Sequence, residues 1–218
     1  MRTTRQITVT TLTAMIFLFT THLHATPLTD DISSLQQEWA RIKYQASESE
    51  QEKLYETLAA RASAVAARYP GKAEPLVWEG IINSTWAGAK GGLGALSLAR
   101  ESRKQLEAAI AIDPAALQGS AYTSLGTLYF KVPGWPLGFG DKAKAEELLK
   151  QALAINPDGI DPNYFYGEFL LEEDRYAESV AVLNHALQSP PRTDRPIADT
   201  GRRAEIQDAL DKARKHLD

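Results

Sequence analysis

Side chains that could bind a metal or carry catalysis are sparse in this sequence of 218 residues. Cysteine is absent, which excludes disulfides and thiolate metal sites. Two of the four histidines, His22 and His24, lie near the N-terminus, and neither His185 nor His216 has a partner at metal-binding spacing. We therefore expect no metal site, no cofactor and no catalytic residue.

Carboxylates and glycines give no stronger indication of an enzyme. Glu146, Glu147 and Lys150 lie at neighbouring turns of an expected helix, which is the usual arrangement of solvated charge pairs. The glycine-rich Gly88–Gly94 follows no expected strand and lacks a phosphate-binding fingerprint, so we interpret it as an insertion. An enzyme based on a serine–lysine or carboxylate pair is the weakest of three hypotheses.

The segment Val132–Gly140 is a stronger candidate for binding. Its prolines restrict the backbone, its glycines permit tight turns, and Trp135 and Phe139 provide large apolar faces. In a structural interpretation, Trp135 fills the gap between adjacent repeats. In a functional interpretation, the segment is a rigid wall or lid over a ligand pocket.

A concave groove is the second candidate surface, on the first helix of each unit of a helical repeat. Its side chains mix aromatic, hydroxyl and single charged groups, which suits a peptide or a small ligand with polar and apolar parts. Aromatic residues on such faces also often belong to the core. The groove candidates are Val77, Ile81, Ser84, Thr123, Thr127, Phe130, Lys131, Tyr164, Glu168 and Leu171.

Regularly spaced prolines indicate the repeat that positions these residues. Helical patterns end at Pro70, Pro114, Pro157 and Pro191, at intervals of 44, 43 and 34 residues. The last interval equals the tetratricopeptide period.

Glycines mark the first helix of each unit. Gly80, Gly126 and Gly167 lie inside expected helices, where glycine costs about 1 kcal/mol relative to alanine. A helix keeps such a glycine where a second helix approaches its backbone closely. From glycine to closing proline, the first two units exceed the third by ten and seven residues. We place these insertions in loops between the helices, at Gly88–Gly94 and Val132–Gly140.

The residues between these markers resemble tetratricopeptide (TPR) repeats over both helices and the terminating proline. The resemblance implies an all-α, TPR-like solenoid of helical hairpins, with repeats at 72–114, 117–157 and 160–191. In the middle repeat it is carried by Tyr122, Leu125, Gly126, Tyr129, Ala145, Leu149 and Ala152.

Amphipathic patterns predict capping helices on both sides of the repeats. An N-terminal pair at 30–70 has helices over 31–46 and 50–69, and a closing helix covers 196–217. Terminal units with a polar outer face are what a solenoid requires. We therefore expect about nine helices in a single domain at 26–218.

The N-terminus has the features of a secretory signal peptide. Arg2 and Arg5 precede a short apolar run, and Ala25 offers a small residue for cleavage. An uncleaved N-terminal anchor is the alternative. Cleavage at 25 predicts a periplasmic chain and lowers the formal net charge from −4 to −6. This acidic balance argues against nucleic acid and anionic membrane surfaces as partners.

Three C-terminal segments carry a second resemblance: Val132–Asp141, Asn156–Leu170 and Pro191–Arg203. They are similar to the T-component (TatT-like) family of bacterial envelope proteins, helical repeat proteins that accompany TRAP-type solute uptake. The resemblance implies a periplasmic partner of a solute-binding protein, an oligomer with a channel that accommodates a ligand.

Two binding hypotheses follow. The first is a periplasmic TPR-type protein that engages a solute-binding protein or a small ligand as an accessory of TRAP-type uptake. The second is an envelope assembly scaffold that binds protein or peptide segments in its groove.

Overall fold

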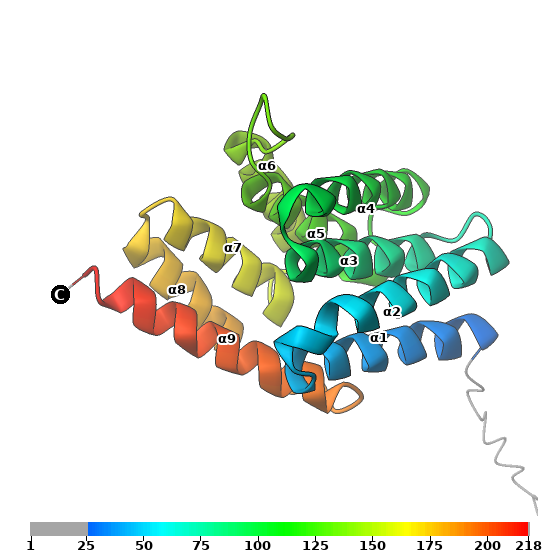
Figure 1. Ribbon diagram of the computed structural model, residues 1–218. Helices are drawn as coiled ribbons and strands as arrows, with labels where there is room; N and C mark the ends of the chain where they lie inside the picture. The colour runs from blue at the N-terminus through cyan, green and yellow to red at the C-terminus, as the bar shows by residue number, and fades with distance from the viewer. Residues whose placement is uncertain (1–25, 218) are drawn as a thin grey trace, which may run out of the picture.

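The computed structural model describes residues 26–217, and the expected signal peptide at 1–25 lies outside them. Nine α-helices follow one another in this part of the chain, which contains no strand, as the sequence predicts (Figure 1). The helices are α1 (Pro27–Gln45), α2 (Glu48–Arg68), α3 (Ala73–Lys90), α4 (Gly92–Ile112), α5 (Ser120–Lys131), α6 (Lys142–Ile155), α7 (Ile160–Glu172), α8 (Tyr176–Leu187) and α9 (Pro196–Arg214), with a 3₁₀ turn at Ala116–Gly119.

Local sequence signals explain where several helices begin. Thr26 caps α1 by accepting a hydrogen bond from the backbone of Thr29 at 3.2 Å, and Asp141 caps α6 in the same way through Lys144 at 3.0 Å. Proline occupies the first turn of α1 and α9, where its missing N–H is not needed. None of the helices in the described residues is long and apolar enough to span a membrane.

The three repeats are the hairpins α3–α4, α5–α6 and α7–α8, and each packs closely at its glycine. A Cβ added to Gly80 would lie 2.7 Å from Leu106, one added to Gly126 would lie 2.8 Å from Leu149, and Gly167 has the same relation to Leu183 at 2.7 Å. The expectation that these glycines admit a neighbouring helix is therefore confirmed.

The first insertion differs from the expected loop. Gly88 belongs to the end of α3 and Gly94 to the first turn of α4, so a turn at Gly91 joins two long helices. Gly91 has φ 64°, a left-handed conformation that glycine adopts without strain. The additional residues thus lengthen the hairpin. The second insertion, at 132–141, is a loop as expected.

The two ends of the helical array meet, which closes it around a hollow. Helix α9 runs along the array and reaches α1 (Figure 1). The Nζ of Lys43 lies 3.0 Å from Glu205, and the hydroxyl of Tyr44 donates to the same carboxylate at 3.0 Å. Gly201 allows this approach, because a Cβ there would lie 2.4 Å from the Tyr44 ring. The junction brings the expected N-terminal and C-terminal caps together.

Candidate ligand-binding cavity

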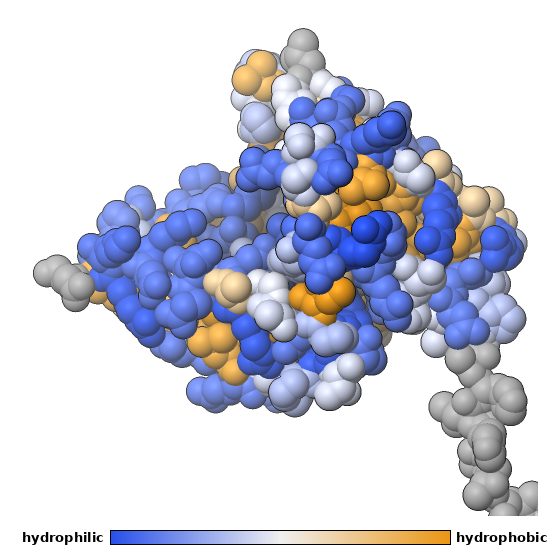
Figure 2. Space-filling model, turned by 60° about the horizontal axis from the view of Figure 1, so that its bottom comes forward, coloured by the Kyte–Doolittle hydropathy of each residue, from blue (hydrophilic) through white to orange (hydrophobic). Residues whose placement is uncertain are grey.

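A cavity of about 690 Å³ lies inside the curved array. Helices α1, α3, α4, α5 and α7 contribute to its wall, together with segments 132–137 and 192–198. This volume is within the range of small-molecule sites, which is roughly 300–1,000 Å³. In the space-filling view, a mostly hydrophilic face carries hydrophobic residues near its middle, where the surface is hollowed (Figure 2).

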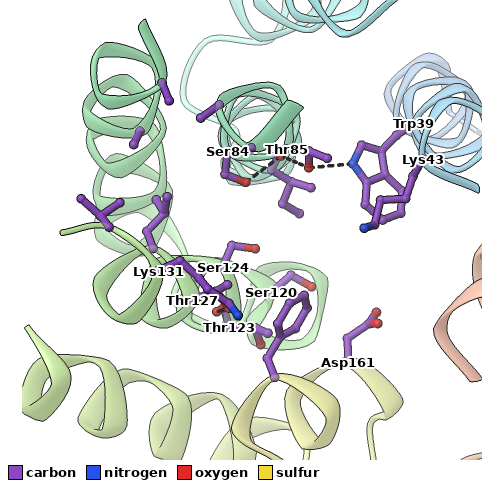
Figure 3. Close-up of a pocket in the computed structure, with 18 of the residues that line it drawn as sticks. Trp39, Lys43, Ser84, Thr85, Ser120, Thr123, Ser124, Thr127, Lys131 and Asp161 are labelled. Atoms are coloured by element: carbon purple, nitrogen blue, oxygen red, sulfur yellow. Dashed lines mark hydrogen bonds between the residues drawn. The ribbon is translucent and has the colours of Figure 1, made fainter. Parts of the chain in front are cut away.

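One side of the cavity is apolar and built from small side chains. Helix α4 places Gly92, Ala95, Leu96 and Ala99 along it, and the segment after α5 adds residues 132–137. The side chains drawn on α4 in Figure 3 carry carbon atoms alone. This side can therefore contact an apolar group but offers it no side-chain hydrogen bond.

Hydroxyl groups from α3 and α5 line the middle of the cavity (Figure 3). Several of them donate to carbonyl oxygens of their own helix: Ser84 and Thr85 donate to Ile81 at 2.8 Å, and Thr127 donates to Thr123 at 2.8 Å. The protons of these hydroxyl groups are therefore already engaged in hydrogen bonds. The cavity meets their methyl or methylene groups and oxygen lone pairs, so this strip is less polar than its composition indicates.

Charged groups gather on the side opposite α4. Asp161, in the first turn of α7, lies 2.7 Å from Nη1 of Arg192 and 2.8 Å from Nε of Arg202. Arg202 is buried and also lies 2.5 Å from Glu205. Its guanidinium carbon stands 4.2 Å from the centroid of the Tyr164 ring. These contacts fix the carboxylate of Asp161 at the edge of the cavity.

The arginines determine the charge state of Asp161. Burial alone would raise its pKa, but the guanidinium groups of Arg202, Arg192 and Arg195 outweigh that effect and lower the pKa to about 2. The side chain is still 34% exposed, because it faces the cavity. The cavity therefore contains a fixed carboxylate at neutral pH.

Two tryptophans, Trp39 of α1 and Trp78 of α3, line the cavity together with the charged groups. The indole N–H of Trp39 donates to Thr85 Oγ1 at 3.0 Å (Figure 3). The Trp39 ring packs edge-on against Trp78 at 5.9 Å between centroids. Both rings line the cavity beside Lys43. A ligand that enters the cavity would therefore change the surroundings of two indoles.

The structure places some of the residues expected in the groove at this cavity. Ile81 and Ser84 line it from α3, and Thr123, Thr127 and Lys131 line it from α5. Lys131 forms ion pairs with Glu168, at 3.3 Å, and with Glu172. Glu168 therefore contacts the cavity only through Lys131.

Four other groove candidates belong to the core. Val77 and Tyr164 are buried, Phe130 packs on Phe169 with ring centroids 5.7 Å apart, and Leu171 packs against the cluster that contains Leu183. The orientation of each helix about its own axis explains why these four residues lie in the core and not at the cavity. The face that we expected to be free in the first helix of each repeat is partly covered by the next repeat and by α9.

The Val132–Gly140 segment contributes to the cavity wall, as the functional interpretation expects, but Trp135 takes no part in it. The Trp135 side chain is 90% exposed, so it fills no gap between repeats, and it is not among the residues around the cavity. Phe139 instead packs edge-on against Tyr129 at 5.5 Å, under the guanidinium of Arg103 at 4.5 Å. The segment does form part of the wall, but through Val132, Pro133 and Leu137.

The two described histidines make local contacts. His185 lies 3.1 Å from Asp158, and the His216 ring stacks on Tyr176 with centroids 4.2 Å apart. Between residues 26 and 217 no cluster of three or more potential metal-ligating side chains occurs.

Sequence reasoning missed the charged side of the cavity. The expected site residues include none of Trp39, Lys43, Trp78, Asp161 and the arginines. Their proximity depends on the contact between α1 and α9, which joins residues about 160 positions apart and leaves no local pattern. The density of arginine in 192–203 is the signal that could have identified this side.

Comparison with known proteins agrees with this geometry. Residues 137–198 match the family model for the tetratricopeptide repeat. The fold is a TPR-like helical solenoid. A thermophilic TPR protein from Thermus thermophilus, TTC0263, superposes with a TM-score of 0.54 at 17% identity, covering 84% of this chain and 91% of that one. MamA superposes with a TM-score of 0.45 at 17% identity, covering 76% of this chain and 90% of its own. No curated protein sequence matches this chain.

Proposed function

We propose that this TPR protein is a periplasmic binding protein that holds a small ligand in its cavity and accompanies TRAP-type solute uptake. The cavity of about 690 Å³, apolar on one side and charged on the other, is the observation that carries the proposal. A site of this kind fixes an apolar body by burial and selects it through a few polar groups.

Two features of the sequence support the cellular setting. The N-terminal pattern that ends at Ala25 is typical of exported chains. The resemblance to T-component proteins supports a role beside a solute-binding protein. In this role the ligand would pass between the cavity and the solute-binding protein, and the TPR scaffold would provide the surface on which the two proteins meet.

Native mass spectrometry of the chain purified from its own envelope tests the ligand-binding part. We expect an additional small mass on the wild-type chain that is absent from Ser124→Trp, because an indole at this cavity position would occupy the ligand's space. Ser97→Trp makes the same change at an exposed position of α4 outside the cavity and should retain the mass. A mass that persists in both variants, or is absent from the wild-type chain, would contradict a ligand in this cavity.

The transport part has a separate test. The tagged chain should recover a solute-binding protein from envelope extract. Recovery of cell-wall or secretion proteins in its place would contradict the transport role and favour a scaffold.

The exposed tip of the 132–141 loop supports that scaffold as a second candidate function. Trp135 is 90% exposed and Leu137 is 71% exposed, and the loop is braced by a hydrogen bond from Gly140 to Pro133 at 3.0 Å. Exposed tryptophan on a rigid loop is typical of protein contacts. If the loop holds a protein partner, Trp135→Ala, a change outside the cavity wall, sharply reduces the partner's recovery from extract and leaves the small-molecule mass in place.

A further inference from the structure

Arg195 occupies a distinctive position in the cavity wall. It is the residue immediately before α9, and its side chain is partly buried and lines the cavity. The guanidinium carbon lies 5.3 Å from the centroid of the Trp78 ring. This cation–π contact holds the charge at the side of the cavity opposite α4.

The other cations of the cavity wall are neutralised by carboxylates. Lys43 pairs with Glu205 at 3.0 Å, and Lys131 pairs with Glu168 and Glu172. Arg192 pairs with Asp161 at 2.7 Å and with Asp199 at 3.3 Å.

Arg195 differs from these cations. Within the described part of the chain, no carboxylate oxygen lies within ion-pairing distance of its guanidinium. The cavity wall therefore contains a guanidinium that forms no ion pair, although Asp161 attracts it from beyond pairing distance.

Two buried hydrogen-bond donors at this position also lack an acceptor. Neither Nε of Arg195 nor Nε1 of Trp78 has a hydrogen-bond partner among the described residues, and both atoms are shielded from solvent. Burial lowers the pKa of Arg195 below its ordinary value, against the opposing effect of Asp161. Leaving such groups unsatisfied is costly. An anion in the cavity would compensate the charge of the Arg195 side chain, which lines the cavity, and could reach these two shielded N–H groups only after a shift of the side chains.

The number of free charges limits the charge of the ligand. One unpaired guanidinium can neutralise a single negative charge, and the fixed carboxylate of Asp161 would repel a second one. A monoanion therefore fits this side of the cavity better than a dianion. Across the cavity, Ala95, Leu96 and Ala99 provide an apolar surface made mostly of small side chains, which suits an unbranched apolar chain.

We infer that the ligand of the cavity is an amphipathic monoanion, such as a monocarboxylate, whose charged group binds Arg195 beside Trp78. Its apolar chain lies against α4 and the 132–137 segment. This inference rests on the ligand-binding part of the proposed function. It adds the chemical class of the ligand and the residue that recognises it.

Binding of three probes of matched chain length tests the inference by calorimetry: decanoate, 1-decanol and decyltrimethylammonium. A charge-assisted hydrogen bond contributes enough free energy for at least about tenfold in affinity. We expect the wild-type chain to bind decanoate at least about tenfold more tightly than 1-decanol and to bind decyltrimethylammonium most weakly.

Arg195→Met keeps the apolar stem and removes the charge. It should therefore abolish the preference, so that decanoate and 1-decanol bind with about equal affinity. Arg195→Lys keeps the charge and should retain part of the preference. Arg100→Met removes an exposed arginine of α4 outside the cavity and should leave the preference unchanged. The wild-type affinity for 1-decanol, retained in Arg195→Met, shows that the variant cavity is intact.

The outcomes separate the inference from the proposed function. If no probe binds the wild-type chain, the anion inference is wrong, and the small mass in native mass spectrometry decides separately whether the cavity holds a ligand. Binding of decanoate and 1-decanol with equal affinity would leave the ligand-binding function standing and overturn the anion inference. A preference for decanoate that survives in Arg195→Met would also overturn the role of Arg195.

Discussion

The hydroxyl of Ser102 donates a hydrogen bond to the carbonyl oxygen of Gly80 across 2.7 Å, and Ser179 forms the same bond with Gly167 at 2.7 Å. Each bond joins the two helices of one hairpin at its glycine. The serine is 22 residues after the glycine in the first repeat and 12 residues after it in the third. This difference is the ten-residue insertion expected from the sequence, so the insertion lengthens the first hairpin without changing how its helices pack.

Gly80→Ala tests this close packing. The new Cβ would lie 2.7 Å from Leu106 and 3.3 Å from the carbonyl of Ser102. Overpacking of this kind costs about 1–3 kcal/mol, which exceeds the helix preference of alanine, so we expect a net loss of about 1–2 kcal/mol by urea unfolding. Gly88→Ala, in the same helix with nothing within 4 Å, should increase stability by about 0.5–1 kcal/mol. Equal effects of the two substitutions on stability would contradict the conclusion that Gly80 admits the close approach of the second helix.

Asp161→Asn tests the arginine cluster. Removing the carboxylate leaves Arg202 buried with one fewer partner, which we expect to cost roughly 3 kcal/mol at pH 7. The pKa of Asp161 is lowered to about 2 in the folded chain, below its ordinary value of 3.8. Its ion pairs therefore stabilise the fold fully above about pH 4 and are lost as the pH falls through about 2.

Urea unfolding of both chains between pH 6 and pH 2 measures this effect. The difference in unfolding free energy between wild type and Asp161→Asn should shrink across the window from about pH 4 to about pH 2. Because the carboxylate is 34% exposed, we expect the pH-dependent part to be no more than about 1–2 kcal/mol. A constant difference would show that the variant acts through packing alone.

Fluorescence should separate the tryptophans of the cavity from the one on the loop. Trp135→Phe should leave the spectral response to decanoate intact and change stability by less than about 0.5 kcal/mol, because Trp135 is 90% exposed. Trp78→Phe should remove most of the response, since Trp78 lines the cavity beside Arg195. A response that depends on Trp135 would place the ligand at the loop.

Substitution by methionine should change the melting temperature in opposite directions at Arg195 and at Arg202. Arg195→Met removes an unpaired charge and should raise the melting temperature by about 2–4 °C, which corresponds to about 1 kcal/mol. Arg202→Met breaks contacts with Asp161 and Glu205 and should lower it. Added decanoate should raise the melting temperature of the wild-type chain more than that of Arg195→Met, because tighter binding to the folded state stabilises it more. A destabilised Arg195→Met chain would indicate a structural role for the arginine.

The fold could be predicted from sequence because its determinants are local. Gly80, Gly126 and Gly167 lie within single hairpins, and a proline follows the second helix of each hairpin, so the spacing of these residues is sufficient to identify the repeat. The cavity could be predicted only in part. Thr123, Thr127 and Lys131 follow from the helical pattern of α5, whereas Lys43 and Arg195 line the same cavity because α1 and α9 are in contact. That junction depends on the curvature of the whole array.

Trp135 shows a second limit of sequence reasoning. A large apolar residue between prolines indicates a rigid, buried contact, yet the loop presents it to solvent. The direction of a side chain in a loop depends on how the loop is braced, here through the bond between Gly140 and Pro133 and the packing of Phe139 on Tyr129. Neither contact could be deduced from composition.

Photo-crosslinking with a decanoate analogue that carries a diazirine at its apolar end tests the orientation of the ligand most directly. With the carboxylate at Arg195, the reactive end should label residues 92–99 of α4 or the 132–137 segment, and excess decanoate should prevent the labelling. Arg195→Met should lower its yield. Labelling at residues 192–198, on the outer surface, or equally strong in Arg195→Met would contradict an amphipathic anion anchored at Arg195.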